Sequence, residues 1–201
     1  MLPFRGGFWG GSGAQYVGGF ALDSGPLYSA LSFPAGTMVG DVAIWNSNNI
    51  PPVSGGTMWS LAGGATVIFI RKVQQADLNS GITTDAGHSQ LSGILVMAVY
   101  RGVIGAMNVR GGGENYAGNP TSAGFVKSPG VRALIGFGRK GNAFNGDPLI
   151  VQPAIFTQRV AVSGAITMAD VLRPGSYADN TPFAAYWRDN GSSVATIFEL
   201  F

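Results

Sequence analysis

The single histidine is the first residue whose type could do chemistry. His88 follows Asp85 by three residues in a polar segment, and an acid close to a histidine invites comparison with a catalytic relay. Such a relay also needs a nucleophile oriented on the histidine, and no serine in the chain has the glycine-flanked setting of a nucleophile elbow. One histidine and no cysteine also leave too few nitrogen and sulfur ligands for a zinc site. We therefore expect neither a catalytic nor a metal-binding role for His88.

A glycine pattern typical of dinucleotide-binding proteins occurs once, as Gly136-Phe-Gly138-Arg-Lys-Gly141. The pattern binds a cofactor only where a helix begins at once, within a βαβ unit, because the helix N-terminus holds the pyrophosphate. Here the next residues are Asn142-Ala-Phe-Asn-Gly-Asp-Pro148, which cannot begin a helix. The sequence thus predicts no cofactor at this position.

The ten carboxylates are scattered along the chain, and no pair has the spacing of a known catalytic or metal-binding motif. Asp77 and Asp85 flank a segment whose oxygens could hold calcium, but their spacing matches no calcium loop. Asp41 lies at the start of an expected strand and Asp170 at an expected turn, where short carboxylates commonly bond nearby backbone amides. We therefore predict structural roles for both.

Aromatic residues on glycine-rich or proline-rich segments are the stronger candidates for recognition. Tyr116 and Tyr177 lie in such segments and could stack on a sugar ring or fill a pocket of a partner protein. They could equally fold back onto the edge of the domain. For Trp59, which follows a proline- and glycine-rich turn, we favour a place in the core.

Low charge sets this chain apart from an ordinary soluble domain. Charged residues make up 11% of it and there are 32 glycines, whereas a typical domain is about 25% charged. A free monomer normally relies on surface charge for solubility, so this composition suggests a surface largely covered by other chains. The formal net charge of +2 is too small to indicate a groove for nucleic acid.

The first 19 residues form a glycine-rich segment that contains the aromatic residues Phe4, Phe8 and Trp9. The segment lacks the unbroken apolar run of a signal peptide, and no stretch of the chain is apolar for long enough to form a transmembrane helix. It is either a disordered end or an arm whose aromatics enter a groove on a neighbouring chain. We expect an arm over residues 1–19 and one folded domain over residues 20–201.

Strand-length runs of β-branched and aromatic residues recur between glycine and proline breaks, and they predict an all-β fold. Both faces of residues 65–73 are apolar, with Val67 and Phe69 on one and Ile68 and Ile70 on the other, as expected of a central strand covered on both sides. Only Ile166–Leu172 could pass for a helix. The expected architecture is a single β-sandwich or jelly-roll domain. The predicted strands are Met38–Trp45, Ala65–Val73, Ile94–Tyr100, Val131–Phe137, Thr157–Val162, Phe183–Arg188 and Val194–Phe201.

Several short motifs between residues 36 and 201 form a recurring set: Gly40-Asp41-Val-Ala-Ile, a loop with Pro51, Pro52, Gly56 and Trp59, Ile70-Arg71-Lys-Val73, Tyr100-Arg101-Gly102-Val103, Thr157-Gln-Arg159 and Met168-Ala-Asp170. Together they resemble motifs of structural β-sandwich proteins of tailed bacteriophages. The resemblance implies a head-surface, tail or fibre component without a shared enzymatic site. We interpret Tyr100 as an aromatic at a strand end and Arg101 as an arginine that holds loop carbonyls.

The leading hypothesis is a virion structural protein on the particle surface, either a capsid decoration or spike protein or a tail-associated component. It would be assembled in the bacterial host cytoplasm and would act by contact with other virion proteins, as a homo-oligomer, with Phe4, Phe8 and Trp9 helping to anchor it. The alternative is a receptor- or carbohydrate-binding module of a tail fibre, with Tyr116 and Tyr177 contacting a host-surface glycan. We expect no enzymatic activity, cofactor, metal, nucleic acid or membrane span.

Replacing His88 with Gln should leave folding and particle assembly unchanged, because no chemistry is assigned to this side chain. Circular dichroism and the amount of protein incorporated into particles provide the measurement. A loss of infectivity with normal incorporation would show that His88 has a function.

Overall fold

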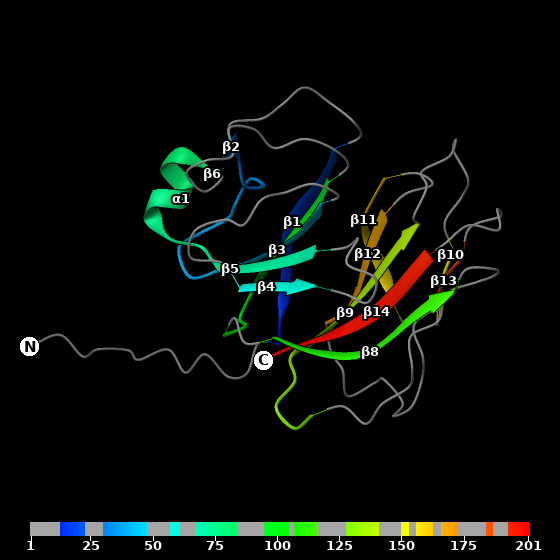
Figure 1. The fold of residues 1–201 in the computed structure, drawn as a ribbon. Coiled ribbons are helices and arrows are strands. Elements are labelled where there is room, and N and C mark those ends of the chain that lie inside the picture. The colour runs from blue at the N-terminus through cyan, green and yellow to red at the C-terminus, as the bar shows by residue number, and fades with distance from the viewer. Residues whose placement is uncertain are drawn as a thin grey trace, which may run out of the picture.

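A computed structural model describes residues 13–22, 30–47, 57–60, 67–83, 95–104, 107–115, 128–140, 150–152, 156–162, 166–172, 184–186 and 193–201. Almost all of the regular structure in these ranges is β, with a single short helix (Figure 1). The elements are β1 (Gln15–Leu22), β2 (Ala30–Leu31), β3 (Val42–Ser47), β4 (Thr57–Ser60), β5 (Val67–Lys72), α1 (Gln75–Ser80), β6 (Ile82–Thr83), β7 (Leu95–Arg101), β8 (Met107–Asn115), β9 (Ala133–Lys140), β10 (Ile150–Gln152), β11 (Thr157–Val162), β12 (Ile166–Val171), β13 (Ala184–Tyr186) and β14 (Ser193–Leu200).

The strands form two five-stranded sheets in which every pairing is antiparallel. The first sheet has the order β1-β7-β3-β5-β4 and the second has the order β11-β12-β9-β14-β8. Two smaller pairs, β2 with β6 and β10 with β13, complete the described strands. The prediction of an all-β fold is confirmed.

One hydrophobic cluster joins the two sheets. The first sheet contributes residues such as Ile44 and Ile68, and the second contributes residues such as Phe137 and Met168, all of them at most 1% exposed. Because successive side chains of a strand point to opposite faces, these residues define the inner face of each sheet. The core of the protein therefore lies between the sheets.

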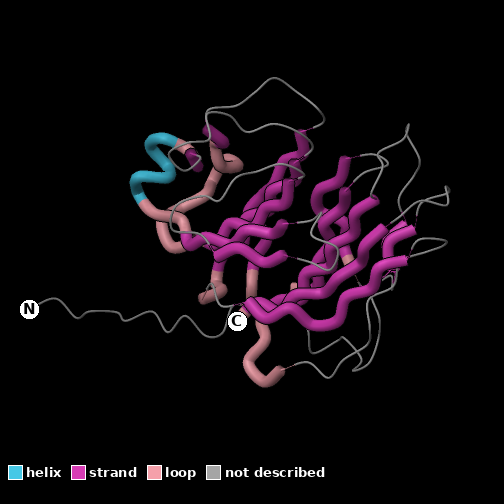
Figure 2. The backbone as a smooth tube through the Cα atoms, viewed as in Figure 1, coloured by secondary structure: helices cyan, strands magenta, loops and turns pink. Residues whose placement is uncertain are grey.

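The other face of the first sheet is also covered. Trp45, Phe69 and Met97 lie on it in a second cluster, and the rings of Trp45 and Phe69 stack with centroids 5.4 Å apart. Leu78 of α1 and Phe33 pack against this cluster, and α1 lies on the side of the first sheet that faces away from the second (Figure 2). The prediction that residues 65–73 form a central strand covered on both sides is confirmed.

Each of the seven predicted strands overlaps an observed strand, and the one segment that could pass for a helix is a strand as well. Residues 166–171 form β12, which is buried along its whole length between β11 and β9. The β-branched residues Ile166, Thr167 and Val171 suit a strand covered on both faces, and burial decides the outcome over the weak helical pattern.

The N-terminal boundary also differs from the expected one. The strand β1 begins at Gln15, and Ala14 is 5% exposed within the core, so residues from position 14 onward belong to the fold. A Cβ at Gly19 would collide with the carbonyl oxygen of Met97 and would lie 2.6 Å from Cγ2 of Val160. Glycine is therefore required here because β1 lies very close to β7 in its own sheet and to β11 in the other sheet, and not for flexibility. Phe4, Phe8 and Trp9 lie outside the described residues.

Two glycines of the dinucleotide-like pattern lie inside a strand. Gly136 and Gly138 belong to β9, where they pair with Ala169 and Thr167 of β12. The strand continues to Lys140, so no helix begins within the described part of this pattern. Among the described residues, no helix is long and apolar enough to cross a membrane.

Replacing Gly19 with Ala should destabilise the protein by about 1–3 kcal/mol, the usual cost of overpacking, because the new methyl group meets backbone and side-chain atoms of both sheets. Gly36→Ala is the control, since a Cβ there has no atom within 4 Å and only the φ of +85° opposes it. Urea denaturation measures both. Equal and small losses in the two variants would contradict the described packing of β1.

Candidate functional site

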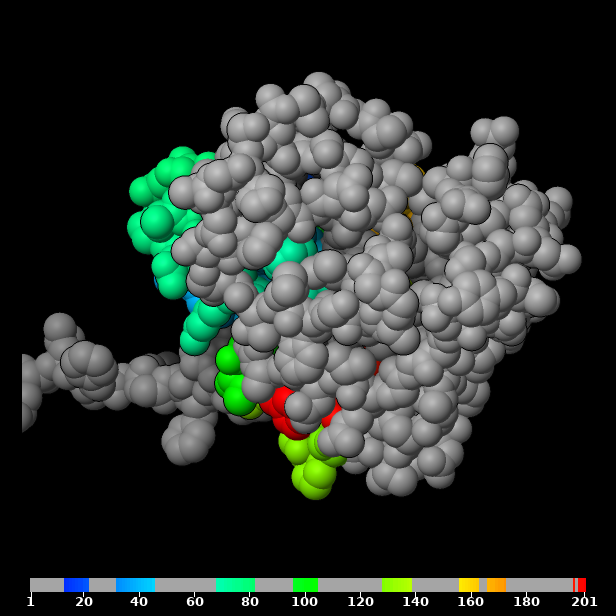
Figure 3. Space-filling model, in the orientation of Figure 1, coloured from blue at the N-terminus to red at the C-terminus, as the bar shows by residue number. Residues whose placement is uncertain are grey.

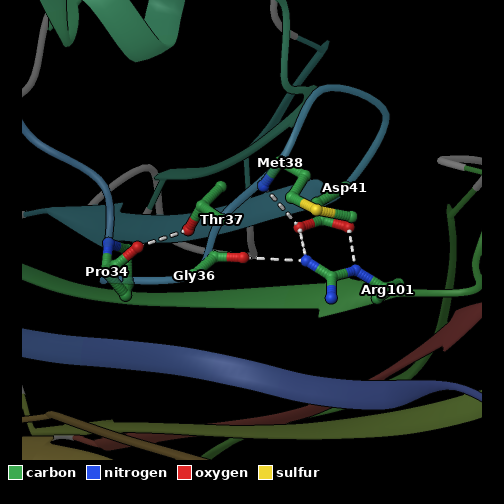
Figure 4. A network of polar contacts seen from close by, with 6 residues as sticks. All are labelled: Pro34, Gly36, Thr37, Met38, Asp41 and Arg101. Atoms are coloured by element: carbon green, nitrogen blue, oxygen red, sulfur yellow. Dashed lines mark hydrogen bonds and ion pairs between the residues drawn. The ribbon is translucent and has the colours of Figure 1, made fainter.

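An ion pair closes the end of the first sheet at which β7 ends and β3 begins (Figure 4). The Nε and NH2 groups of Arg101 each donate to Asp41, at 2.8 Å to Oδ1 and 2.8 Å to Oδ2. The same NH2 group donates to the carbonyl oxygen of Gly36 at 2.8 Å, and the backbone N–H of Met38 donates to Asp41 Oδ2 at 2.8 Å. Asp41 therefore bonds a nearby backbone amide, and Arg101 holds a loop carbonyl, as the sequence predicted.

A second ion pair fixes α1 to the end of β5. Arg71 donates to Asp77 at 2.7 Å and 3.0 Å, and the backbone N–H of Gln74 donates to Asp77 Oδ2 at 2.9 Å. The carboxylate of Asp77 is thus neutralised and caps the first turn of the helix. Asp85, the other carboxylate considered as a calcium ligand, lies outside the described residues. The described residues contain no cluster of three or more metal-ligating side chains.

A third cluster of polar side chains connects the two sheets, with one residue from each of four strands. Arg159 of β11 donates from Nε to Asp170 Oδ2 of β12 at 2.9 Å. The guanidinium of Arg159 lies over the ring of Tyr16 in β1, 4.8 Å from its centroid. The ring of Tyr16 meets that of Tyr100 in β7 edge to face, with centroids 5.8 Å apart. We call these four residues the intersheet cluster.

Burial governs the acid–base behaviour of this cluster. It raises the pKa of Asp170, although the hydrogen bond and the charge of Arg159 partly oppose that shift. Burial also raises the pKa of Tyr100 well above its ordinary value, and the nearby charge of Asp170 adds to the effect. The hydroxyl of Tyr100 and Oδ1 of Asp170 make no hydrogen bond of regular geometry, so Asp170 acts on the pKa of Tyr100 mainly through its charge.

The intersheet cluster is a structural element rather than a reaction centre. Asp170 is 1% exposed and Tyr100 is fully buried, so a substrate cannot reach either group. We expected Asp170 to bond backbone amides at a turn, which is wrong, because it lies within β12 and pairs with an arginine. A buried carboxylate needs such a partner, since an unpaired charge in the core would cost several kcal/mol.

A fourth buried carboxylate holds the segment before β9 against the last strand. Glu199 of β14 accepts hydrogen bonds from the backbone N–H of Ser128 at 2.6 Å and from its hydroxyl at 2.8 Å. Nearby, Arg132 donates to the carbonyl oxygen of Gly102 at 2.8 Å. These hydrogen bonds of the Glu199 and Arg132 side chains connect the end of β7, the turn before β9 and the C-terminal strand.

Most residues that the sequence singled out for recognition or chemistry lie outside the described part of the chain. These are Phe4, Phe8, Trp9, His88, Tyr116 and Tyr177. Trp59 lies in β4, opposite Ile68 of β5. No motif in the sequence indicated the pairing of Arg159 with Asp170, which lie eleven positions apart on the adjacent antiparallel strands β11 and β12.

Replacing Asp170 with Asn should change how the free energy of unfolding depends on pH. A carboxyl whose pKa is raised by folding binds its proton more tightly in the folded state, so its contribution to stability is fully present below its unfolded pKa and is lost as the pH rises through its folded pKa. The stability of the wild type relative to D170N should therefore increase as the pH falls from neutral toward about 4.

Urea denaturation of both proteins over this pH range tests the prediction, and the other carboxylates cancel in the difference. A relative stability of the wild type that decreases toward low pH would show that the attraction of Arg159 outweighs burial.

Comparisons with known proteins assign this chain to no family. No protein-family model, no curated protein and no solved structure matches it. Its own residues and their geometry are therefore the basis for a functional assignment.

Proposed function

We propose that this chain is a structural protein of a bacteriophage virion, located on the particle surface, where it acts by assembly with other virion proteins. In this proposal the two sheets form a β-sandwich of the jelly-roll type, and residues 1–12 serve as an attachment arm. The protein is a capsid decoration or spike protein or a tail-associated component, and it forms a homo-oligomer.

The observation that carries the proposal is that the chain has few charged residues and buries the carboxylates whose side chains are described. Charged residues make up only 11% of the chain. The four carboxylates whose side chains are described, Asp41, Asp77, Asp170 and Glu199, are all buried, with at most 4% exposed. They stabilise the interior and add no carboxylate to the described surface. Such a surface suits a protein that neighbouring chains cover, because low surface charge promotes association.

The edges of the sheets indicate how such association would occur. Register shifts interrupt β1 between Tyr16 and Gly18, β11 between Gln158 and Val160, and the pairing of β8 with β14 beside Thr196. Bulges of this kind twist an edge strand and impede the addition of a further strand. Since β1, β11 and β8 are three of the four outer strands of the large sheets, contact through strand ends, loops and the arm is favoured over strand addition.

Two of the motifs that resemble phage structural proteins meet in space. Asp41 of the first motif and Arg101 of a later one form the ion pair at the end of the first sheet. Because this pair holds a loop in place, the motifs have a structural purpose, which agrees with a protein that acts by assembly. The alternative function, glycan or receptor binding, depends on Tyr116 and Tyr177, and no observation on the described residues favours it.

Immunogold labelling of purified particles of a phage that carries this chain tests the proposal. We expect label on the surface of intact particles, at repeated positions. Protein that is abundant in infected cells but missing from purified particles would overturn the proposal.

Deleting residues 1–12 should leave a folded protein that attaches less strongly to particles. The deletion ends before Gly13 because Ala14 belongs to the core. Burial of Phe4, Phe8 and Trp9 in a partner could contribute about 1.5–3 kcal/mol each, and ordering the backbone would cost about 1–2 kcal/mol per residue. Circular dichroism and particle binding measure the two effects, with the charge-neutral variant Ser12→Ala as control. A folded truncated protein that binds at full strength would exclude the arm from attachment.

A further inference from the structure

One end of the first sheet combines exposed aliphatic side chains with exposed cations. Met38, Val39 and Ile104 are the large hydrophobic residues that are exposed in the described part of the chain, at 53%, 55% and 67%. Lys72 and Arg132 are exposed as well. We call these five residues the basic-apolar end.

Hydrogen bonds and close approaches connect these residues into one surface around Arg101. The carboxylate of Asp41 binds both Arg101 and the backbone N–H of Met38. A Cβ on Gly40, the residue after Val39, would lie 4.0 Å from Cε of Lys72. Ile104 follows Arg101 by three residues and bonds the backbone of Phe201, while Arg132 donates to Gly102.

The visible surface agrees with this arrangement. Residues 96–104 (green), 199–201 (red) and 128–138 (lime) lie near one another along the lower edge of the molecule (Figure 3). The chain also enters the fold at this end, since Gln15 pairs with Arg101. The basic-apolar end is therefore where an attachment arm would leave the domain.

The cations of this end have no counter-charge among the described side chains. Among the described residues, neither Lys72 nor Arg132 forms an ion pair, and Asp41 already binds Arg101. All described carboxylate side chains are buried. Within the described part of the chain, no carboxylate is left to complement these two cations, so a partner could supply the complementary charge.

We propose that the basic-apolar end is the docking surface for a protein partner that presents carboxylates around an apolar centre. This inference rests on the proposed function and names the chemistry of the partner. The N-terminal arm of a second copy does not fit, because residues 1–12 contain Arg5 and no carboxylate. A nucleic acid fits less well, since Met38, Val39 and Ile104 are aliphatic and offer no ring on which a base could stack.

A defined probe tests the surface without any particle. The probe is a synthetic 12-residue peptide of alternating Glu and Leu pairs, and its matched control has Gln in place of each Glu. We expect the full chain to bind the acidic peptide about tenfold more tightly than the control, as two charge pairs at the rim of an interface allow. The preference should weaken as salt rises, because exposed charges are screened.

The variants separate this surface from the rest of the molecule. Lys72→Gln with Arg132→Gln should reduce binding of the acidic peptide by roughly tenfold. The control, Asn79→Glu with Ser80→Glu on exposed positions of α1, changes the net charge by the same amount and should have little effect. Ile104→Thr keeps all charges and should also weaken binding, which tests the apolar part of the surface.

Three results would overturn the inference. They are equal losses in the α1 control and in the Lys72 and Arg132 variant, tighter binding of a single-stranded DNA oligonucleotide than of the acidic peptide, and self-association that is abolished by the same two substitutions. Particles without label would overturn the proposed function but leave the peptide result unaffected, so the two failures can be told apart.

Discussion

The need of a buried carboxylate for a partner is the constraint on which the rest of this structure depends. Each of the four described carboxylates is out of water, and each is held by an arginine, a backbone N–H or a serine. The pair of Asp170 and Arg159 matters most, because it lies where β1, β7, β11 and β12 meet and because Tyr16 and Tyr100 surround it. Loss of one partner would leave a charge in the core, so these pairs fix the arrangement of strands more than they add to stability.

This internal use of charge connects the fold with the proposed function. A chain with few charged residues has placed its described carboxylates where they hold loops and sheets together, at the ends of β7, β5 and β14 and between the sheets. Among the described side chains, the exposed cations Lys72 and Arg132 lie with aliphatic side chains at one end of the first sheet. A surface of this kind is poorly suited to a free monomer and well suited to contact with an acidic neighbour.

The sequence predicts those parts of the fold that depend on local patterns. Two apolar faces identified the central strand at residues 65–73, and the setting of Asp41 beside a strand predicted its bond to a backbone amide. Parts that depend on distant contacts were missed. Gly18 and Gly19 suggested a flexible arm, although the reason for Gly19 is the nearness of Met97 and Val160. Nothing near Arg159 in the chain indicates that a bulge directs it toward Asp170 and Tyr16. The glycines of β8 likewise removed the apolar pattern by which a strand is predicted. This strand forms because it pairs with β14 along its length.

Hydrogen exchange of the free chain and of the same chain on particles tests the central claim most directly. The claim is that the described carboxylates are paired within the interior and that the basic-apolar end contacts a neighbouring virion protein. It predicts that amides of residues 36–41, 102–104 and 128–132 become protected on the particle, while those of β7 and β12 are already protected in the free chain. Protection that is unchanged at this end, or that appears only on other described segments, would contradict the account.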